Sequence, residues 1–384
     1  MKIMYVSDAL AIWGGLERVL AGKANLLASR EGYEIFVVTA NQGQHPLPYP
    51  LDKRVGFCDL DIRFHQQYQF HSIRRWRMRL QLQRLFKERL RQQIESVRPD
   101  VIVCMRIEFV KTLAEVKGDI PLVFESHSSC LMRRFEGYNF LRRCYAAWLN
   151  RQVRRTQTVV ALTEGDAAEW RKITPRVTVI PNIVSLNEGG SVTDGQSKTV
   201  MFVGRFSKQK DLGSLLRIWE LVSRRHPDWQ LHIYGGYGEE QERLMPIVKG
   251  LGERVVVHEP TDRILTEYKK HAVLLLTSLF EPFGLVMPEA MSCGLPVVAF
   301  DCPYGPADII TDGLDGFLVK GRSVERFAEK VCQLIEQPAL RRKMGQAAVG
   351  AAKRYRAVNV LPQWEALFDC VCPKAEDSGG CKEE

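Results

Sequence analysis

The sequence predicts an α/β protein with two domains, each built on a parallel sheet that helices cover on both faces. Three observations indicate this fold class. The chain has 384 residues, which is too many for one hydrophobic core and suits two α/β domains. Its composition, with 45% hydrophobic and 26% charged residues, is typical of globular proteins. Short runs of β-branched residues alternate with helical stretches in both halves of the chain.

The short apolar runs are expected to form buried strands. In the first half of the chain they lie at residues 3–6, 34–39, 101–104, 122–124 and 158–161. Helical periodicity is found near 15–31, 80–97 and 138–154. In the second half, strands are expected at 199–203, 230–234, 254–257, 272–276 and 296–300, with helices between them.

The boundary between the domains is expected near residues 181 and 182, because residues 189–197 that follow have the glycine- and serine-rich composition of a linker. The sequence therefore predicts an N-terminal Rossmann-like domain at 1–181 and a C-terminal one at 182–355. A last helix at about 356–370 is expected to pack back on the first domain. Ligands of open α/β sheets bind at the carboxyl ends of the strands, so two such sheets would face each other across a cleft.

The ends and the cysteines bear on the location of the protein. The first residues lack the apolar stretch and cleavage site of a signal peptide, and no run reaches the roughly eighteen apolar residues of a membrane span. The ten cysteines show no metal-ligand spacing and are expected to be reduced and mostly buried. We therefore expect a cytoplasmic protein.

The strongest functional signal is the segment 281–289, Glu-Pro-Phe-Gly-Leu-Val-Met-Pro-Glu, which follows the expected strand at 272–276. Because a proline and a glycine follow Glu281, we expect it in a loop, with Glu289 inside the next helix. Peptide N–H groups at 283–285 would then be free to bind a polar ligand. Two solvated surface glutamates are the alternative, but the apolar neighbours argue against it, since a buried carboxylate without a partner is costly.

A second signal is the basic segment 204–210, directly after the expected strand at 199–203. Arg205, Lys208 and Lys210 place three cations before a helix, which suits a diphosphate. The charges alone would better fit an ordinary exposed loop. Their position at the end of a strand favours a phosphate site.

Three weaker signals also follow strands. Gly14 and Gly15 would let the backbone approach a phosphate at a helix start, although paired glycines also mark many tight turns. The segment 235–238, Gly-Gly-Tyr-Gly, is equally ambiguous. His127 follows the strand at 122–124, and a lone histidine is more often structural than catalytic.

Together these motifs resemble the retaining nucleotide-sugar glycosyltransferases of family four, which have the GT-B fold of two Rossmann-like domains facing across a cleft. The resemblance covers nearly the whole chain and is most specific at residues 199–319. Glu281 and Glu289 match the family's two glutamates with seven residues between them. The stretch 302–313 resembles the branch of the family that builds bacterial surface polysaccharides.

The resemblance implies a role for each residue of the acidic motif. Glu281 would lie against the donor sugar as a catalytic residue. The backbone of Phe283, Gly284 and Leu285 would also meet the sugar. Glu289 would bind the ribose hydroxyls.

The resemblance also implies the remaining donor contacts. Arg205 and Lys210 match the family's arginine and lysine five residues apart, which hold the donor diphosphate. Gly15 matches the glycine whose N–H meets the phosphate, and His127 takes the place of a histidine near the reaction centre.

Two positions depart from the family pattern. Asp211 stands where glycine or asparagine is common, and Thr163 with Glu164 only partly matches a segment that usually contains serine. These departures concern local loop geometry rather than the class of protein.

The implied reaction breaks the bond between the sugar and the β-phosphate. Arg205, Lys210 and the Gly15 N–H would stabilise the negative charge that develops on that phosphate. No acidic pair of metal-ligand type lies nearby in the sequence, so we expect no metal and no cofactor. The resemblance further implies retention by same-face attack, with UDP as the expected nucleotide and a hexose or N-acetylhexosamine as the sugar. The acceptor would be a glycan or a lipid-linked oligosaccharide.

Three other functions are open at this stage. A nucleotide-sugar 2-epimerase of related architecture would need further acid and base residues, which are not evident. A non-catalytic protein that binds sugar nucleotides would use the same donor residues. A nucleic-acid-binding protein would interleave aromatic residues with cations, but only Trp76 lies inside a basic run, so no nucleic-acid partner is expected.

The net charge of +9 is concentrated in one half: residues 1–181 carry +11 and residues 182–384 carry −2. Residues 71–98 alone contain nine cations and two acids. One helical stripe there is expected to pack on the domain: Met78, Leu82, Leu85, Phe86, Leu90, Ile94 and Val97. The cations on the other side are expected to face solvent: Arg77, Arg84, Lys87, Arg91 and Arg98.

A second basic stretch consists of Arg133, Arg134, Arg142, Arg143, Arg151, Arg154 and Arg155. A solvated helix face is the plain interpretation of such charge runs. The number of like charges nevertheless favours peripheral binding to an anionic membrane surface, at the inner face of the plasma membrane.

Overall fold

The chain forms two compact units in the computed structural model, which describes residues 1–128, 130 and 140–373. The first unit contains residues 1–162, 166–183 and the described residues from 360 on. The second contains residues 163–165 and 184–359. Each unit has its own parallel sheet and its own hydrophobic core.

The sheet of the first unit has its described strands in the order β3-β2-β1-β4-β5-β6-β7, all parallel. These strands are β1 (Lys2–Ser7), β2 (Glu34–Thr39), β3 (Gly56–Asp59), β4 (Val101–Cys104), β5 (Leu122–Glu125), β6 (Thr158–Ala161) and β7 (Val177–Val179). At the centre, the register pairs Ile3 of β1 with Val101 of β4. Every residue of β4, β5 and β6 is buried, as expected for a sheet that is covered on both faces.

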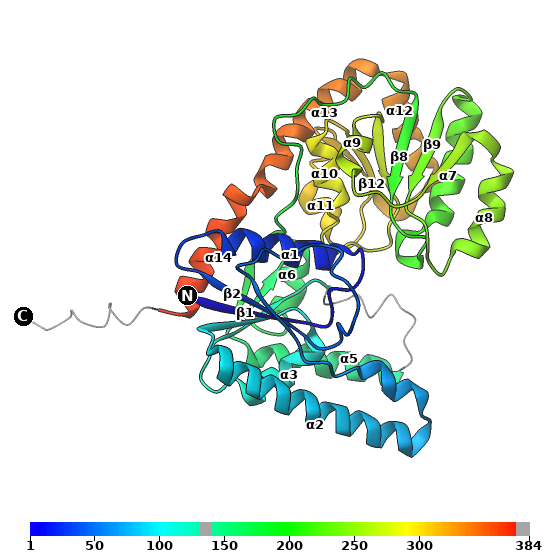
Figure 1. The fold of residues 1–384 in the computed structure, drawn as a ribbon. Helices are drawn as coiled ribbons and strands as arrows, with labels where there is room; N and C mark the ends of the chain where they lie inside the picture. Colours follow the sequence, from blue (N-terminus) through cyan, green and yellow to red (C-terminus); the bar gives the residue numbers. More distant parts are fainter. Residues whose placement is uncertain (129, 131–139, 374–384) are drawn as a thin grey trace, which may run out of the picture. The chain divides into compact units, whose positions relative to one another are not determined.

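The helices of the first unit cover both faces of this sheet (Figure 1). They are α1 (Gly15–Ala28), α2 (Ser72–Val97), α3 (Ile107–Val116), α5 (Phe140–Arg151), α6 (Glu164–Arg171) and α14 (Ala357–Val371), with the 3-10 helices η1 (Phe64–Gln69) and η2 (Gln152–Arg155). In Figure 1, α1 and α14 lie on one side of the sheet, and α2, α3 and α5 lie on the other. The last helix, α14, buries Trp364 and Phe368.

Helix α2 begins at Ser72, eight residues before the start expected from the sequence. Its predicted apolar stripe is confirmed. Five members are buried, namely Leu82, Phe86, Leu90, Ile94 and Val97, while Met78 and Leu85 pack partly buried against the same core. The helix therefore turns one face to the unit and the opposite face, which carries its arginines, to solvent.

The sheet of the second unit has its described strands in the order β10-β9-β8-β11-β12-β13, again all parallel. These strands are β8 (Thr199–Val203), β9 (Gln230–Tyr234), β10 (Val255–His258), β11 (Val273–Leu276), β12 (Val297–Phe300) and β13 (Gly316–Val319). In each unit the first strand lies inside the sheet and the chain then moves to the other side, which is the strand order of a Rossmann fold. The predicted fold class is confirmed.

The helices of the second unit also lie on both faces of its sheet; in Figure 1, α7 and α8 lie on one side and α9 and α10 on the other. They are α7 (Leu212–Arg225), α8 (Gln241–Gly250), α9 (Ile264–Tyr268), α10 (Val286–Ser292), α11 (Gly305–Ile309), α12 (Val324–Glu336) and α13 (Pro338–Ala352). Short 3-10 helices are η3 (Lys208–Lys210), η4 (Gly252–Arg254), η5 (Lys320–Arg322) and η6 (Lys353–Tyr355). No helix in the described part of the chain is long and apolar enough to cross a lipid bilayer.

Candidate active site

The basic loop of the second unit connects β8 to α7. Its cations lie at the carboxyl end of β8, where Arg205 and Lys208 are exposed and the side chain of Lys210 is 17% exposed. Asp211 closes the loop as the N-cap of α7, because its side chain accepts a hydrogen bond from the N–H of Ser214. The loop thus presents cations in front of a helix that begins directly behind them.

The glycine-rich loop after β9 packs closely against this basic loop. Gly235 has a φ of +132°, and a Cβ atom there would lie 2.2 Å from the carbonyl oxygen of Gly204. Only glycine allows this approach of two backbones. The ambiguous segment at 235–238 therefore has a structural role in shaping the basic loop.

Glu281 lies in the loop between β11 and α10 and is 4% exposed. Its Oε1 accepts a hydrogen bond from Ser278 Oγ at 2.6 Å and lies 2.5 Å from Lys210 Nζ. A hydroxyl and an ammonium group therefore offset the cost of burying this carboxylate. The structure brings together two of the predicted donor residues, Glu281 and Lys210, although they lie 71 residues apart.

Glu289 lies in α10, as expected from the sequence, and is 1% exposed. The hydroxyl of Tyr268 in α9 donates to its Oε2 at 3.2 Å. Before α10 the chain turns at Gly284, whose φ is +89°. Among the described residues, none accepts a hydrogen bond from the peptide N–H groups at 283–285. These donors are available to a polar ligand.

Side-chain contacts hold the basic loop and the acidic loop together. Thr277 Oγ1 donates to the carbonyl oxygen of Lys210 at 2.9 Å, and Gln209 Nε2 donates to that of Phe280 at 3.0 Å. The two loops are therefore fixed to each other next to the Lys210–Glu281 pair. No sequence signal identified Thr277 or Gln209, since threonine and glutamine are common in loops.

Arg322, at the end of η5, connects to the same two loops. Its guanidinium lies 2.5 Å from Asp211 Oδ2 and donates to the carbonyl oxygens of Thr277 at 2.9 Å and Ser278 at 2.7 Å. The guanidinium carbon also lies 4.4 Å from the ring centroid of Phe300. Arg322 was not predicted as a functional residue.

In the first unit, the predicted phosphate contact Gly15 begins α1, after the loop that follows β1. No described residue accepts a hydrogen bond from its N–H. The N-cap position before it is Gly14, which is extended and offers no side chain to cap the helix. The N–H of Gly15 is thus available to an anion.

His127 follows β5 in the first unit and belongs to a buried charged group. Its Nε2 lies 3.0 Å from Glu125 Oε1, and the other carboxylate oxygen of Glu125 lies 2.5 Å from Lys23 Nζ. Burial alone would raise the pKa of Glu125, but the charges of Lys23 and His127 together lower it to about 2. The ammonium of Lys23 also lies 3.8 Å from the ring centroid of Trp364 in α14.

In this group, His127 contacts the ionised carboxylate of Glu125, which is held in place by the core, and does not lie on a solvated surface. Lys23 and Glu125 are 2% and 1% exposed, so both side chains are held by the core. The sequence did not reveal either residue, because a lysine in the middle of α1 and a glutamate at the end of β5 have no motif that relates them.

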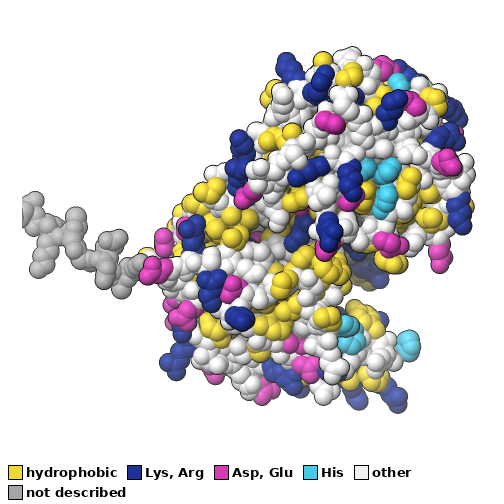
Figure 2. Space-filling model, turned by 45° about the horizontal axis from the view of Figure 1, so that its top comes forward, with side chains coloured by type: hydrophobic (Ala, Val, Ile, Leu, Met, Phe, Trp, Pro, Cys, Tyr) yellow, Lys and Arg dark blue, Asp and Glu magenta, His cyan; other side chains and the backbone are white. Residues whose placement is uncertain are grey.

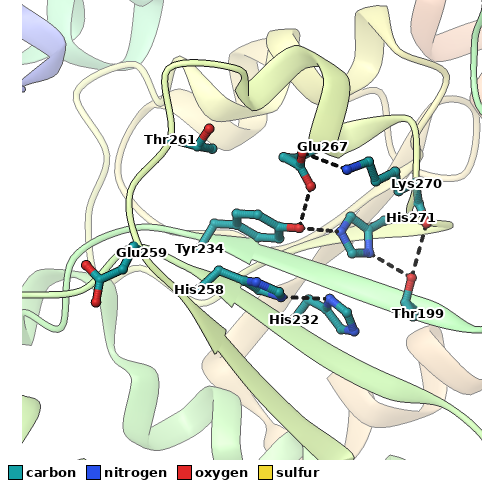
Figure 3. A pocket seen from close by; sticks show the side chains of 9 residues that line it. All are labelled: Thr199, His232, Tyr234, His258, Glu259, Thr261, Glu267, Lys270 and His271. Carbon is teal, nitrogen blue, oxygen red and sulfur yellow. Dashed lines mark hydrogen bonds and ion pairs between the residues drawn. The ribbon is translucent and has the colours of Figure 1, made fainter.

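The second unit also has a pocket of about 570 Å³ over the edge of its sheet at β9 and β10 (Figure 3). It is lined by Thr199, His232, Tyr234, His258, Glu259, Thr261, Glu267, Lys270 and His271. Tyr234 donates to Glu267 at 2.7 Å, and ring nitrogens of His232 and His258 lie 3.0 Å apart. His271 Nδ1 lies 2.7 Å from Thr199 Oγ1.

The three histidines of this pocket have lowered pKa values. Burial, with a smaller contribution from His232, lowers the pKa of His271 to about 3. Burial is also the main cause that lowers the pKa of His232 and of His258. The rings are therefore uncharged at neutral pH.

A group of possible metal ligands in the described residues consists of His226, Cys332 and Glu336. It lies at the carboxyl ends of α7 and α12. The basic loop precedes the amino end of α7, a helix of 14 residues or roughly 20 Å, so this group is remote from the predicted diphosphate contacts.

Comparison with known proteins identifies the family. The family described as Glycosyltransferase Family 4 matches residues 13–188, and the family described as Glycosyl transferases group 1 matches residues 187–350. The chain belongs to the GT-B glycosyltransferases that are built from these two domains, and the family predicted from the sequence motifs is confirmed.

Several curated relatives match over most of their length. The chain is 28% identical to the amylovoran biosynthesis glycosyltransferase AmsD of Erwinia amylovora, over 96% of this chain and 99% of the relative. It is 22% identical to the lipopolysaccharide 1,6-galactosyltransferase of Escherichia coli, over 85% of this chain and 87% of the relative.

Solved structures share the fold. A mutant of Staphylococcus aureus TarM in complex with fondaparinux, α-GlcNAc-glycerol and UDP superposes with a TM-score of 0.79 at 15% identity, covering 96% of this chain and 99% of TarM. Anabaena HepE in complex with UDP-glucose superposes with a TM-score of 0.74 at 19% identity, covering 96% of this chain and all of HepE.

Proposed function

We propose that the protein is a retaining, metal-independent glycosyltransferase that takes a hexose or an N-acetylhexosamine from a UDP-sugar. The acceptor is a glycan or a lipid-linked oligosaccharide of a bacterial surface polysaccharide. The observation that carries the proposal is the Lys210–Glu281 pair, which joins the basic loop to the acidic motif. Next to it lie the N–H groups at 283–285, which donate to no acceptor among the described residues. The relative in amylovoran biosynthesis and the UDP-containing neighbours support the choice of pathway class and nucleotide.

In the proposed reaction, the bond between the anomeric carbon and the β-phosphate oxygen breaks, and its electron pair stays on that oxygen. Arg205 and Lys210 stabilise the charge that accumulates there. Glu281, whose carboxylate accepts a hydrogen bond from Ser278, contacts the donor sugar. Glu289 binds the ribose. The acceptor hydroxyl attacks the face that the phosphate leaves, and its proton passes to the departing phosphate oxygen.

The same arrangement supports the proposal of metal independence. In this proposal the two cations provide the charge stabilisation that a divalent ion would otherwise supply. The contacts of Gly15 and His127 with the donor are carried over from the family motifs and stay predictions.

The enzyme can be tested with water as the acceptor, which avoids the unknown acceptor. Purified protein is incubated with each of the four α-linked UDP-sugars of glucose, galactose and their N-acetyl forms, and UDP release is followed with and without EDTA. We expect release with at least one donor, unchanged by EDTA, and NMR should detect the α-anomer of the free sugar before it equilibrates. Glu281→Gln should keep UDP binding but lose release, whereas Glu289→Ala should weaken donor binding.

Each other outcome identifies a different function. A β-anomer as first product would show inversion, and loss of activity with EDTA that magnesium restores would show a metal requirement. A changed sugar configuration would identify an epimerase. Binding of a UDP-sugar with no release from any donor and no transfer to polysaccharide or lipid acceptors would identify a binding protein.

We also propose peripheral attachment to the inner face of the plasma membrane through the cations of the first unit. Arg77, Arg84, Arg91 and Arg98 are exposed along α2, as expected, while Lys87 is engaged at 2.8 Å by Glu115 of α3. Of the second basic stretch, Arg142, Arg143, Arg151, Arg154 and Arg155 are exposed, and Arg133 and Arg134 lie outside the described residues. Cations near an anionic leaflet contribute about 1 kcal/mol each.

A further inference from the structure

The exposed apolar side chains of the protein are concentrated at one place in the first unit. Among the described residues, fifteen large hydrophobic side chains are exposed, and seven of them come from η1, the start of α2 and α5. We call these seven residues the aromatic tip: Tyr68, Ile73, Trp76, Phe140, Leu141, Tyr145 and Trp148. Singly exposed apolar residues need no explanation, but such a concentration does.

The tip is formed by two helical stripes that meet in a groove. Leu141, Tyr145 and Trp148 repeat at the spacing of one face of α5, and Ile73 and Trp76 do the same on α2. A groove of about 410 Å³ between α2, α3 and α5 is lined by Trp76, Tyr145 and Trp148 among others. The rings of Tyr145 and Trp148 are stacked in it, with centroids 5.7 Å apart and an interplanar angle of 22°.

These stripes are distinct from the one that packs on the unit. The core-facing stripe of α2 begins with Leu82, whereas Ile73 and Trp76 are 67% and 61% exposed. On α5, the buried residues are Ala146 and Leu149, whereas Leu141 is 75% exposed. The side chains of Ile73, Trp76 and Leu141 are therefore not needed to hold the helices in place.

The segments that form the tip are rich in cations, and the groove also has Glu108 and Glu115 of α3 in its lining. Residues 62–87 include seven lysines and arginines and no aspartate or glutamate, and residues 140–151 include three arginines and no acid. Arginines also lie against its rings: the guanidinium carbon of Arg75 is 4.6 Å from the Tyr68 centroid, and that of Arg79 is 5.9 Å from the Tyr145 centroid. Where α2 begins, hydrophobic and cationic side chains lie next to each other on the surface (Figure 2, lower right).

We infer that the aromatic tip inserts into the interfacial layer of a bilayer with anionic lipids. Tryptophan and tyrosine favour that layer, aliphatic side chains enter below it, and arginines bind the lipid phosphates. Single-stranded nucleic acid would also fit aromatic rings among cations, but Ile73, Phe140 and Leu141 need an apolar medium rather than the planar faces and phosphates of a strand. This inference deepens the proposed membrane attachment: part of the binding is apolar and withstands salt.

The test compares tip variants with a matched control. Sedimentation with phosphatidylglycerol-containing and pure phosphatidylcholine vesicles is measured at 0.1 M and 0.5 M NaCl for the wild type, Trp76→Ser/Leu141→Ser and Ile247→Ser/Leu314→Ser. The control pair removes two apolar side chains of the second unit, which are 47% and 54% exposed. Thermal unfolding shows whether each variant is folded.

We expect the wild type to bind anionic vesicles at both salt concentrations and the control to match it. The tip variant should lose about tenfold or more in affinity, with nothing left at 0.5 M NaCl. Brominated lipids should quench tryptophan fluorescence of the wild type more than that of Trp76→Phe. Complete release of the wild type by salt, or equal binding by the tip variant, would overturn the inference.

Two further results would also decide against a bilayer site. A wild type that is dimeric in solution and a tip variant that is monomeric would identify the tip as a contact between copies. Binding of a single-stranded oligonucleotide that the tip variant loses, without any binding to vesicles, would identify a nucleic-acid site. UDP release without lipid should be the same in wild type and tip variant, so a failure of the sugar chemistry is distinguishable from a failure of the tip.

Discussion

At the scale of single residues, the backbone conformation at Asp211 explains why the family pattern has glycine or asparagine at this position. Asp211 has a φ of 47°, in the left-handed region that glycine and asparagine enter most easily, which is why those residues are common there. Its carboxylate, one residue after Lys210, adds a negative charge beside a loop that is proposed to hold a diphosphate. The guanidinium of Arg322 lies 2.5 Å from this carboxylate and compensates the charge.

This pairing predicts a rescue. Arg322→Ala should raise the donor KM about tenfold, because the charge of Asp211 would then oppose the diphosphate. The double variant Arg322→Ala/Asp211→Asn should recover most of the affinity, as asparagine keeps the cap and tolerates the backbone. Lys320→Ala is the matched control, since it removes an exposed cation two residues away. The measurement is the KM and kcat of UDP release.

The double variant distinguishes the loss of charge compensation from the loss of the hydrogen bonds that hold the loops. Arg322 also donates to two carbonyl oxygens, and a variant that fails through the loss of those bonds would stay impaired whatever residue stands at 211. Equal KM values for the single and the double variant would reject charge compensation.

The sequence predicted the residues that a motif identifies but not the residues that position them. Glu281, Glu289, Arg205 and Lys210 stand in short patterns with fixed spacing, and their chemistry is evident from the residue types. Arg322 lies 111 residues from Asp211. No local pattern relates such a pair, because only the folding of the sheet brings the two loops to one edge.

At the scale of elements, the central strands were predictable, and of the edge strands β10 was predicted whereas β3, β7 and β13 were not. Strands β4, β6 and β11 are wholly buried and stand out as apolar runs. The edge strands β3 and β7 have partly exposed residues and are only four and three residues long, so their sequences look like loops. The start of α2 was placed too late because the arginine-rich segment before Met78 has few buried positions to mark its period.

The histidine pocket at β9 and β10 predicts loss of stability in acid. The pKa of His271 is lowered to about 3 in the folded chain, mainly by burial, while an unfolded histidine titrates near 6.5. The folded state therefore binds fewer protons than the unfolded state between these values. The contribution of uncharged His271 to the free energy of unfolding is therefore fully present above pH 6.5. It decreases as the pH drops toward 3, by at most about 1.4 kcal/mol per pH unit for one histidine.

The groups that face these rings do not cancel the effect. Among the charged groups that face these rings, Glu267 raises the histidine pKa values, and Lys270, whose ammonium lies 2.8 Å from the Glu267 carboxylate, lowers them.

Thermal unfolding of His271→Gln from pH 7.5 to pH 4.5 should show a weaker dependence on pH than that of the wild type. His226→Gln, at the end of α7 and outside the pocket, is the control. Parallel curves for His271→Gln and the wild type would contradict the assignment.

At the scale of the whole molecule, the chain passes between two units with separate cores. Apart from residues 163–165, the second unit begins at residue 184, and the chain returns to the first unit at residue 360, so most of α14 joins the first unit although it comes last in the sequence. The predicted donor residues are divided in the same way. Arg205, Lys210 and the acidic motif belong to the second unit, whereas Gly15 and His127 belong to the first.

This division gives a test of whether one donor engages both units. Hydrogen exchange of the full chain, read by mass spectrometry, should slow on adding UDP-glucose at residues 204–212 and 281–289 of the second unit. It should also slow at residues 14–18 of the first, because a donor phosphate that takes the Gly15 N–H stabilises the first turn of α1. Helix α2 should not change. At one hundred times Kd, the bound state gains about 2.7 kcal/mol, enough for slowing of up to roughly a hundredfold where opening requires release of the donor.

A variant connects the two responses. Glu289→Ala should reduce protection at both sites at a fixed donor concentration, since its proposed effect is on donor affinity and the amides of α1 are protected only while the donor is bound. UDP alone and UDP-glucose should both protect residues 204–212, because the diphosphate is common to them. Protection in the second unit with no change at residues 14–18, at saturating donor, would leave the proposed transferase chemistry of the second unit intact and show that the role given to Gly15 is wrong.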